Sequence, residues 1–196
     1  QDLTGRAQNE TTIAVNPTDP LNLAGAWNDF FAYPRTVVGY GWTRDGGQTW
    51  QSDRLMPVTL DRWTSTADPA LAFDGAGSLF LAMLAYGGAD EGILVARSDD
   101  GGETFAGPVR VSSGGDKPYV ATDPVSNAVY VFWGEVAGGF SIFFSKSTDG
   151  GATFTAPLKI SDAGDSGNNL AAPGVGPNGE VYVAWSDTDL PIEFDR

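Results

Sequence analysis

The sequence contains no histidine and no cysteine, so any chemistry must come from carboxylates, Tyr, Lys, Arg or a bound hard cation. This composition excludes Ser-His-Asp triads, thiol nucleophiles and cysteine-ligated zinc or iron–sulfur sites. The chain has 25 acidic and 11 basic residues, which give a net charge of −14. Because phosphate binding needs a basic surface, this charge argues against a nucleic-acid partner.

Carboxylates and aromatic side chains that gather between short apolar runs are typical of carbohydrate sites. Paired carboxylates can act as acid and base in glycoside hydrolysis, and the remaining polar groups can bind sugar hydroxyls. The catalytic candidates are Asp29, Asp61 and Arg62. The candidate ligand-binding residues are Arg35, Trp63, Asp68, Asp116, Lys117 and Glu135.

The segment Asp61-Arg62-Trp63 is the leading functional candidate because it interrupts the longest connection between repeats. The alternative is a connection that only folds back on itself. Four other aromatic residues recur at the end of corresponding apolar runs, which favours packing between repeats over sugar binding. These four are Trp27, Tyr86, Trp133 and Trp185.

Three acidic residues, Glu10, Asp68 and Asp116, lie near the start of corresponding apolar runs. A repeating fold would bring them together as a partial acidic ring, and such a ring could hold Ca²⁺, which takes oxygen ligands. The alternative is a solvated rim, and no EF-hand spacing is present. The sequence requires no cofactor.

The strands that must position these residues are indicated by a motif that occurs three times. It has the form Ser/Thr-x-Asp-Gly-Gly-x-Thr-aromatic and covers residues 43–50, 98–105 and 147–154, about 50 residues apart. Gly-Gly permits a tight turn, Asp accepts hydrogen bonds from turn N–H groups, and the aromatic ring packs beneath. Asp45, Asp100 and Asp149 are therefore predicted to be structural, with catalysis or metal binding as the alternative. We call this motif the box.

Each box is preceded by three short runs rich in Val, Leu, Phe, Tyr and Trp, and it is followed by a fourth. No sustained helical period is present, and the longest uninterrupted apolar run, residues 79–86, is far too short to span a membrane. Four strands per unit of about 50 residues predict a β-propeller blade. The predicted blades cover residues 9–58, 67–113, 116–162 and an incomplete 168–196, within one domain over 1–196.

Arg97 and Lys146 directly precede a box, and Arg196 occupies the corresponding position at the end of the sequence. About three and a half blades leave open sheet edges and cannot close a ring. We therefore expect a fragment of a six- or seven-bladed propeller. The remainder of that propeller, or a second chain, would be needed to close the ring.

The three boxes resemble the Asp-box, or BNR, repeats of the sialidase-like β-propellers, and the resemblance covers nearly the whole chain. It implies an all-β propeller of four-stranded antiparallel blades, a glycan-directed function, an extracellular or cell-surface location, and a site on the face opposite the boxes. The family includes sialidases, other glycan-degrading propellers and non-catalytic binding and sorting receptors, so the fold alone does not determine the function.

Sialidases carry an Arg in a Phe/Tyr-Arg-Ile-Pro motif on the first inner strand, and the acid/base Asp of the family lies in a first-blade loop. Here that strand reads Glu-Thr-Thr-Ile-Ala-Val over residues 10–15 and has no Arg, while Asp29 is the local candidate for the acid/base. The sequence predicts a secreted or surface-exposed propeller that binds or cleaves glycans. Whether it is an exo-sialidase-like hydrolase stays open, and the alternative is a non-catalytic interaction or structural propeller of an extracellular assembly.

Overall fold

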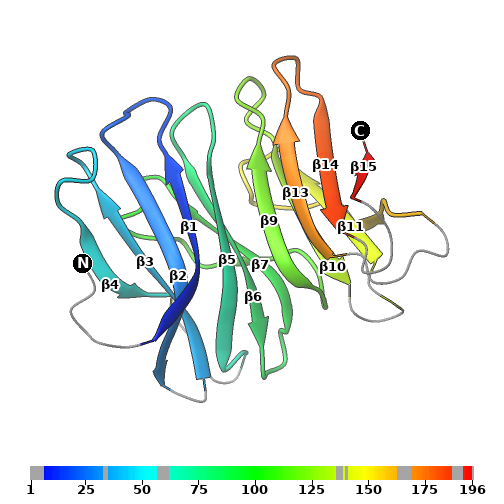
Figure 1. Ribbon diagram of the computed structural model, residues 1–196, viewed down its shortest axis with the longest axis horizontal. Helices are drawn as coiled ribbons and strands as arrows, with labels where there is room; N and C mark the ends of the chain where they lie inside the picture. The colour runs from blue at the N-terminus through cyan, green and yellow to red at the C-terminus, as the bar shows by residue number, and fades with distance from the viewer. Residues whose placement is uncertain are drawn as a thin grey trace.

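The computed structural model describes residues 7–32, 35–56, 62–135, 139, 141–162, 169–186 and 192–195. These residues form strands and turns, and none of the described segments is helical (Figure 1). Accordingly, no helix in the described ranges has the length and apolar character needed to cross a membrane. The prediction of an all-β chain is confirmed.

Four antiparallel sheets follow one another along the chain, and in each the strands pair in sequence order. The first contains β1 (Gln8–Val15), β2 (Leu23–Ala32), β3 (Arg35–Thr43) and β4 (Gln51–Leu55). The second contains β5 (Ser65–Phe73), β6 (Leu79–Tyr86), β7 (Gly92–Ser98) and β8 (Val109–Arg110). The third contains β9 (Asp116–Thr122), β10 (Val129–Glu135), β11 (Ser141–Ser147) and β12 (Leu158–Lys159), and the last contains β13 (Asn169–Val175), β14 (Val181–Ser186) and β15 (Glu193–Asp195).

The first strands of successive sheets lie next to one another, so β1, β5, β9 and β13 form a row through the molecule (Figure 1). We call these four the inner strands. The sheets pack face to face through three apolar clusters, one at each junction between neighbouring sheets. Burial of apolar side chains on both faces explains why the central strands of the second sheet read as almost continuous apolar runs.

Two of the recurring aromatic residues fill these junctions. Trp133 is 1% exposed in the cluster between the second and third sheets, and Trp185 is 5% exposed in the next cluster. Trp27 lies against Gly39, where an added Cβ would come within 2.4 Å of the indole Nε1. Packing, rather than sugar binding, is therefore the observed role of Trp133 and Trp185.

Each box forms the hairpin between the third and fourth strands of its sheet, and all three use the same hydrogen bonds. In the last box the Ser147 hydroxyl donates to Asp149 Oδ1 over 2.8 Å, and Thr153 donates to the same carboxylate through its N–H and its hydroxyl at 2.9 and 2.6 Å. The two glycines have φ of 70° and 83°, in the left-handed region that favours glycine. Asp45 and Asp100 make the corresponding contacts, so all three carboxylates are used within their own hairpins.

Candidate functional site

Every inner strand contains one extra residue near its start, and this β-bulge determines where the functional side chains point. In each case three steps along the inner strand face two steps along the second strand, as between Asn9 and Thr12 of β1. Each bulge holds one non-glycine residue with φ between 47° and 57°, in the left-handed region that such residues rarely adopt. These four residues are Glu10, Asp68, Lys117 and Leu170.

The bulges lie at the end of the sheets opposite the boxes. In an antiparallel sheet, the end of the third strand lies beside the end of the first, and the boxes follow the third strands. The bulges, in contrast, occur near the start of the first strands. The two sets of residues are therefore separated by the length of a blade.

The bulge of β9 corrects one prediction from the sequence. Lys117, and not Asp116, occupies the position equivalent to Glu10 and Asp68, because Asp116 still pairs with Gly134 on β10 before the bulge begins. The Asp116 carboxylate accepts the N–H of Lys117 at 3.0 Å instead of joining an acidic ring. The predicted ring of three carboxylates is therefore wrong in its third member.

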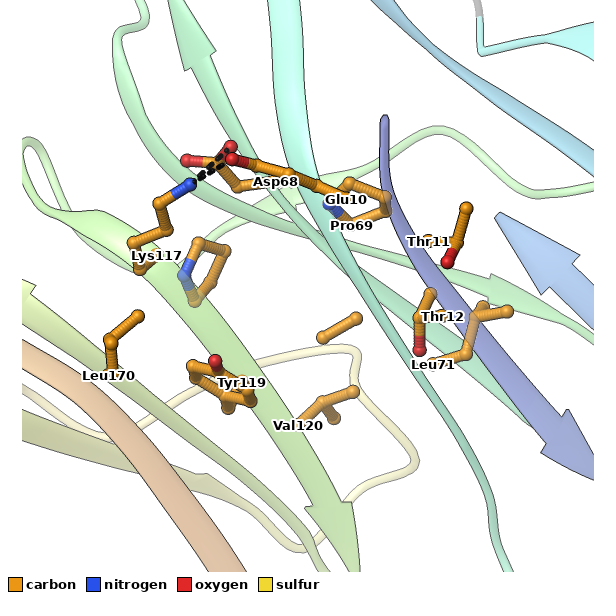
Figure 2. Close-up of a pocket in the computed structure, with 12 residues that line it drawn as sticks. Glu10, Thr11, Thr12, Asp68, Pro69, Leu71, Lys117, Tyr119, Val120 and Leu170 are labelled. Atoms are coloured by element: carbon orange, nitrogen blue, oxygen red, sulfur yellow. Dashed lines mark hydrogen bonds and ion pairs between the residues drawn. The ribbon is translucent and has the colours of Figure 1, made fainter. Parts of the chain in front are cut away.

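Lys117 binds both of the remaining carboxylates. Its Nζ lies 2.6 Å from Glu10 Oε1 and 3.2 Å from Asp68 Oδ1 (Figure 2). The Glu10 side chain is 41% exposed and that of Asp68 only 11%, so the group lies at the surface with Glu10 on the solvent side and Asp68 largely buried. We call Glu10, Asp68 and Lys117 the bulge cluster.

The predicted Ca²⁺ site gains no support from this arrangement. The Lys117 ammonium already occupies the position between the two carboxylates that a cation would take. Across the part of the chain that the structure describes, no group of three or more acidic side chains is arranged to hold a metal ion.

The charges of the bulge cluster influence one another. A hydrogen bond with the Asp68 carboxyl raises the pKa of Glu10 and outweighs the opposing effect of Lys117. Partial burial lowers the pKa of Lys117, but its contacts with Glu10 and Asp68 outweigh that effect and leave the pKa raised. Lys117 therefore stays charged at neutral pH, while Glu10 accepts a proton more readily than an isolated glutamate.

Asn28 connects the first two sheets beneath this cluster. Its Nδ2 donates to Glu10 Oε2 at 3.1 Å, and its Oδ1 accepts the backbone N–H of Asp68 at 2.8 Å. The residue is 5% exposed, so its amide has few other orientations available. Asn28 is not among the candidate residues predicted from the sequence, and a polar residue inside a run that continues as strand was the missed signal.

A cavity of about 400 Å³ adjoins the bulge cluster and is lined by residues of all four inner strands (Figure 2). Its lining combines the three charged groups with the hydroxyls of Thr12 and Tyr119, the ring of Pro69 and the apolar side chain of Leu170. Thr12, Tyr119 and Leu170 were not predicted as site residues. Concave cavities with a few converging polar groups are the usual form of small-molecule sites.

The leading candidate segment lies elsewhere. Arg62 Nε donates to Asp90 Oδ2 at 2.6 Å, and its guanidinium lies 5.0 Å from the centre of the Trp63 ring. Trp63 itself is 2% exposed within the apolar cluster between the first two sheets, so the prediction that it binds ligand is wrong. The Arg62 carbonyl also accepts the backbone N–H of Asp90 in the β6–β7 turn at 2.9 Å. Asp61 lies outside the described residues.

The other predicted residues do not line the cavity. Asp29 is 0% exposed inside the first sheet and accepts a hydrogen bond from Gln8 Nε2 at 3.1 Å, so it has no surface with which to contact a substrate. Arg35 is exposed at the start of β3, and Glu135 ends β10, where it lies against Gly114. Of the predicted set, the structure brings together Glu10, Asp68 and Lys117.

No known family model matches this sequence, and no curated protein sequence matches it. Solved structures do resemble it. A Hadza microbial sialidase, Hz136, superposes with a TM-score of 0.74 and 16% identity, over 97% of this chain and 44% of its own. The intramolecular trans-sialidase of Ruminococcus gnavus superposes with a TM-score of 0.72 and 12% identity, over 96% of this chain and 67% of its own. The α-L-arabinanase of Penicillium chrysogenum superposes with a TM-score of 0.68 and 15% identity, over 91% of this chain and 57% of its own.

The chain thus spans less than half the length of the sialidase and a little over half that of the arabinanase. At such low identities the likeness concerns the backbone, and it agrees with the four sheets described above. This chain has the sialidase-like β-propeller fold.

Proposed function

We propose that this chain supplies a carbohydrate-binding site of a sialidase-like propeller, and that the site is the bulge cluster with its adjoining cavity. The observation that carries the proposal is the convergence of Glu10, Asp68 and Lys117 on one cavity from three separate sheets. Similarity to a sialidase and an arabinanase supports a glycan as the ligand class.

The chemistry of the lining suits a sugar. Carboxylates accept hydrogen bonds from sugar hydroxyls, and the Lys117 ammonium donates to hydroxyl or ring oxygens. Thr12 and Tyr119 add hydroxyls that both donate and accept, while the Pro69 ring and Leu170 offer apolar contact to C–H groups. A ligand of alternating polar and apolar edges therefore meets a matching set of groups.

Glycoside hydrolysis is the second candidate function, and the Glu10–Asp68 contact favours it. A glutamate whose pKa is raised by a neighbouring carboxyl can hold a proton as general acid while the other carboxylate stays ionised. In this reaction Glu10 would donate its proton to the leaving oxygen as the glycosidic bond breaks, and Asp68 would take a proton from the water molecule that forms the new bond to the sugar carbon. Lys117 would hold the two groups in place.

Three further features belong to this proposal. The boxes act as Asp boxes, supported by their identical hydrogen-bond pattern. The protein works outside the cell or on its surface. The exposed apolar side chains of Ile13 and Val15 on β1, 61% and 53% exposed, are covered by further blades or by a second chain that closes the ring.

Binding to a glycan array, followed by NMR titration with the sugars that bind, tests the proposal. We expect Glu10→Gln to weaken binding at least about fivefold, and Lys117→Met to weaken the binding of neutral sugars by a similar factor. The matched controls are Glu103→Gln and Lys159→Met, which change exposed residues outside the cavity. Equal binding by cluster and control variants would place the site elsewhere, and no binding to any glycan would overturn the proposal.

Turnover is tested separately with 4-methylumbelliferyl glycosides, including a sialoside and an arabinofuranoside. Release that disappears in Glu10→Gln supports hydrolysis at the bulge cluster. Binding without release from any glycoside supports the non-catalytic function.

A further inference from the structure

The charge balance of the cavity suggests which sugars it accepts, an inference that rests on the proposed function. Two of its described lining residues, Glu10 and Asp68, are acidic, and Lys117 is the one basic residue among them. The fourth bulge position, where another cation would be well placed, holds Leu170. The lining residues that the structure describes therefore carry an excess of one negative charge, in a chain whose net charge is −14.

The single cation is already engaged. Lys117 Nζ contacts Glu10 at 2.6 Å and Asp68 at 3.2 Å. A ligand carboxylate could use only the third N–H of the ammonium, and it would lie close to both of these carboxylates. The Asn28 amide also donates to Glu10, through a hydrogen bond to Oε2. An anionic sugar would thus add a third negative charge and find no free cationic partner among the described lining residues.

A ligand amine meets the opposite situation. Glu10 Oε1 and Asp68 Oδ1 already orient toward one ammonium, and their side chains are 41% and 11% exposed, so a second ammonium can approach from the solvent side. The neighbouring Asp68 carboxyl raises the pKa of Glu10, as expected where two acidic groups lie close together, while the Lys117 ammonium opposes this effect.

We infer that the bulge cluster selects sugars by charge: it binds sugars with a free amine most tightly, neutral sugars less tightly, and rejects sugars that carry a carboxylate. The selectivity comes from two carboxylates that share one lysine, with an apolar residue at the remaining bulge position.

The test uses the whole chain and three matched pyranoses, D-glucosamine, D-glucose and D-glucuronate, with N-acetylneuraminate as a second anion. Dissociation constants are measured by NMR titration at neutral pH and low salt. We expect glucosamine to bind about three- to tenfold more tightly than glucose, and glucuronate to bind weaker by a similar factor. Raising the salt concentration should narrow both differences because screening weakens partly exposed charge pairs.

Two variants assign the effect to the bulge cluster. Glu10→Gln removes one negative charge and should reduce the glucosamine-to-glucuronate preference at least about threefold. Lys117→Met removes the competing ammonium and should widen it. Glu103→Gln and Lys159→Met should leave the preference unchanged.

Glucuronate or N-acetylneuraminate binding as tightly as glucose to the unmodified chain would overturn the inference and leave the proposed function standing. Failure of every sugar and every array glycan to bind would instead overturn the proposed function, and this inference with it. The comparison in the unmodified chain and its salt dependence do not depend on the variants folding.

Discussion

Lys117 of the third sheet and Glu10 of the first, 107 residues apart in sequence, form an ion pair at 2.6 Å. The second sheet lies between them and contributes Asp68 to the same ammonium. One side chain therefore ties three blades together at one end of the inner strands. This end of the molecule therefore combines the proposed sugar site with a contact that holds the blades in position.

Removing the pair should cost measurable stability. We expect Lys117→Met to lower the free energy of unfolding by about 1 kcal/mol, because it leaves Glu10 and Asp68 facing each other without a cation. Chemical denaturation of the single variants and of Lys117→Met with Glu10→Gln gives the coupling energy. We expect about 0.5 kcal/mol, and a coupling of zero would show that the pair is only a surface contact.

Asn28 is predicted to be a positioning residue. Asn28→Ala removes the donor to Glu10 and leaves the Asp68 N–H buried without its acceptor, so unfolding should become easier by about 1–3 kcal/mol. Sugar affinity should also fall. Asn28→Asp restores the acceptor for Asp68 but not the donor to Glu10, and we expect it to recover stability more than affinity. Equal recovery of both would contradict this division of roles.

Binding of an amino sugar should depend on pH through Glu10. Because the pKa of Glu10 is raised, the carboxylate is lost as pH falls through a value above the ordinary glutamate range, and affinity for glucosamine should fall with it. The folded state also takes up this proton more readily than the unfolded chain, so the stability contributed by Glu10 is present at lower pH and lost as pH rises. Glu10→Gln should give a flat profile over the same range in NMR titrations.

The boxes should respond to acid in the opposite direction. Hydrogen bonds from the Thr49 and Thr153 hydroxyls and N–H groups lower the pKa of Asp45 and Asp149 to about 2. A depressed pKa contributes stability above the unfolded value of about 4, and this is lost as pH falls toward 2. Thermal unfolding between pH 6 and 2 should therefore show a steeper loss of Tm in the native chain than in Asp149→Asn, and parallel curves would argue against this linkage.

A glycine of the second box should be sensitive to any side chain. Gly101 has φ of 72°, and an added Cβ would lie 2.5 Å from Asn22 Oδ1, whose amide donates to the Gly101 carbonyl. Gly101→Ala should therefore destabilise the chain by about 1–3 kcal/mol. Gly107 has no atom within 4 Å of an added Cβ, so Gly107→Ala is the matched control and should change stability by less than about 1 kcal/mol.

Features that depend on local geometry could be predicted from the sequence. The box needs two residues with positive φ and one acceptor side chain, and these requirements are visible in eight consecutive residues. The bulge cluster depends instead on one extra residue in each of three strands. A bulge moves the functional position by one place, so Asp116 was aligned with Asp68 where Lys117 belongs.

Burial and strand length account for the other differences. Trp63 was predicted to be functional because it has no counterpart in the other repeats, but its side chain packs in the apolar cluster between two sheets. Polar residues such as Asn28 and Asp29 usually end a strand, whereas β2 continues through them to Ala32. Their side chains contact residues of β1 and β5, which are distant in sequence, so no local pattern predicts these contacts.

The four bulges determine how the lining of the cavity can change by substitution. Strand pairing resumes on both sides of each extra residue, so the identity of that residue is nearly independent of sheet register. Exchanging Glu10, Asp68, Lys117 or Leu170 therefore alters the chemistry of the opening without shifting the strand register, although loss of Lys117 also removes its contacts between blades. Single substitutions at the four bulge positions are therefore a direct way to engineer new ligand preferences at this end of the propeller.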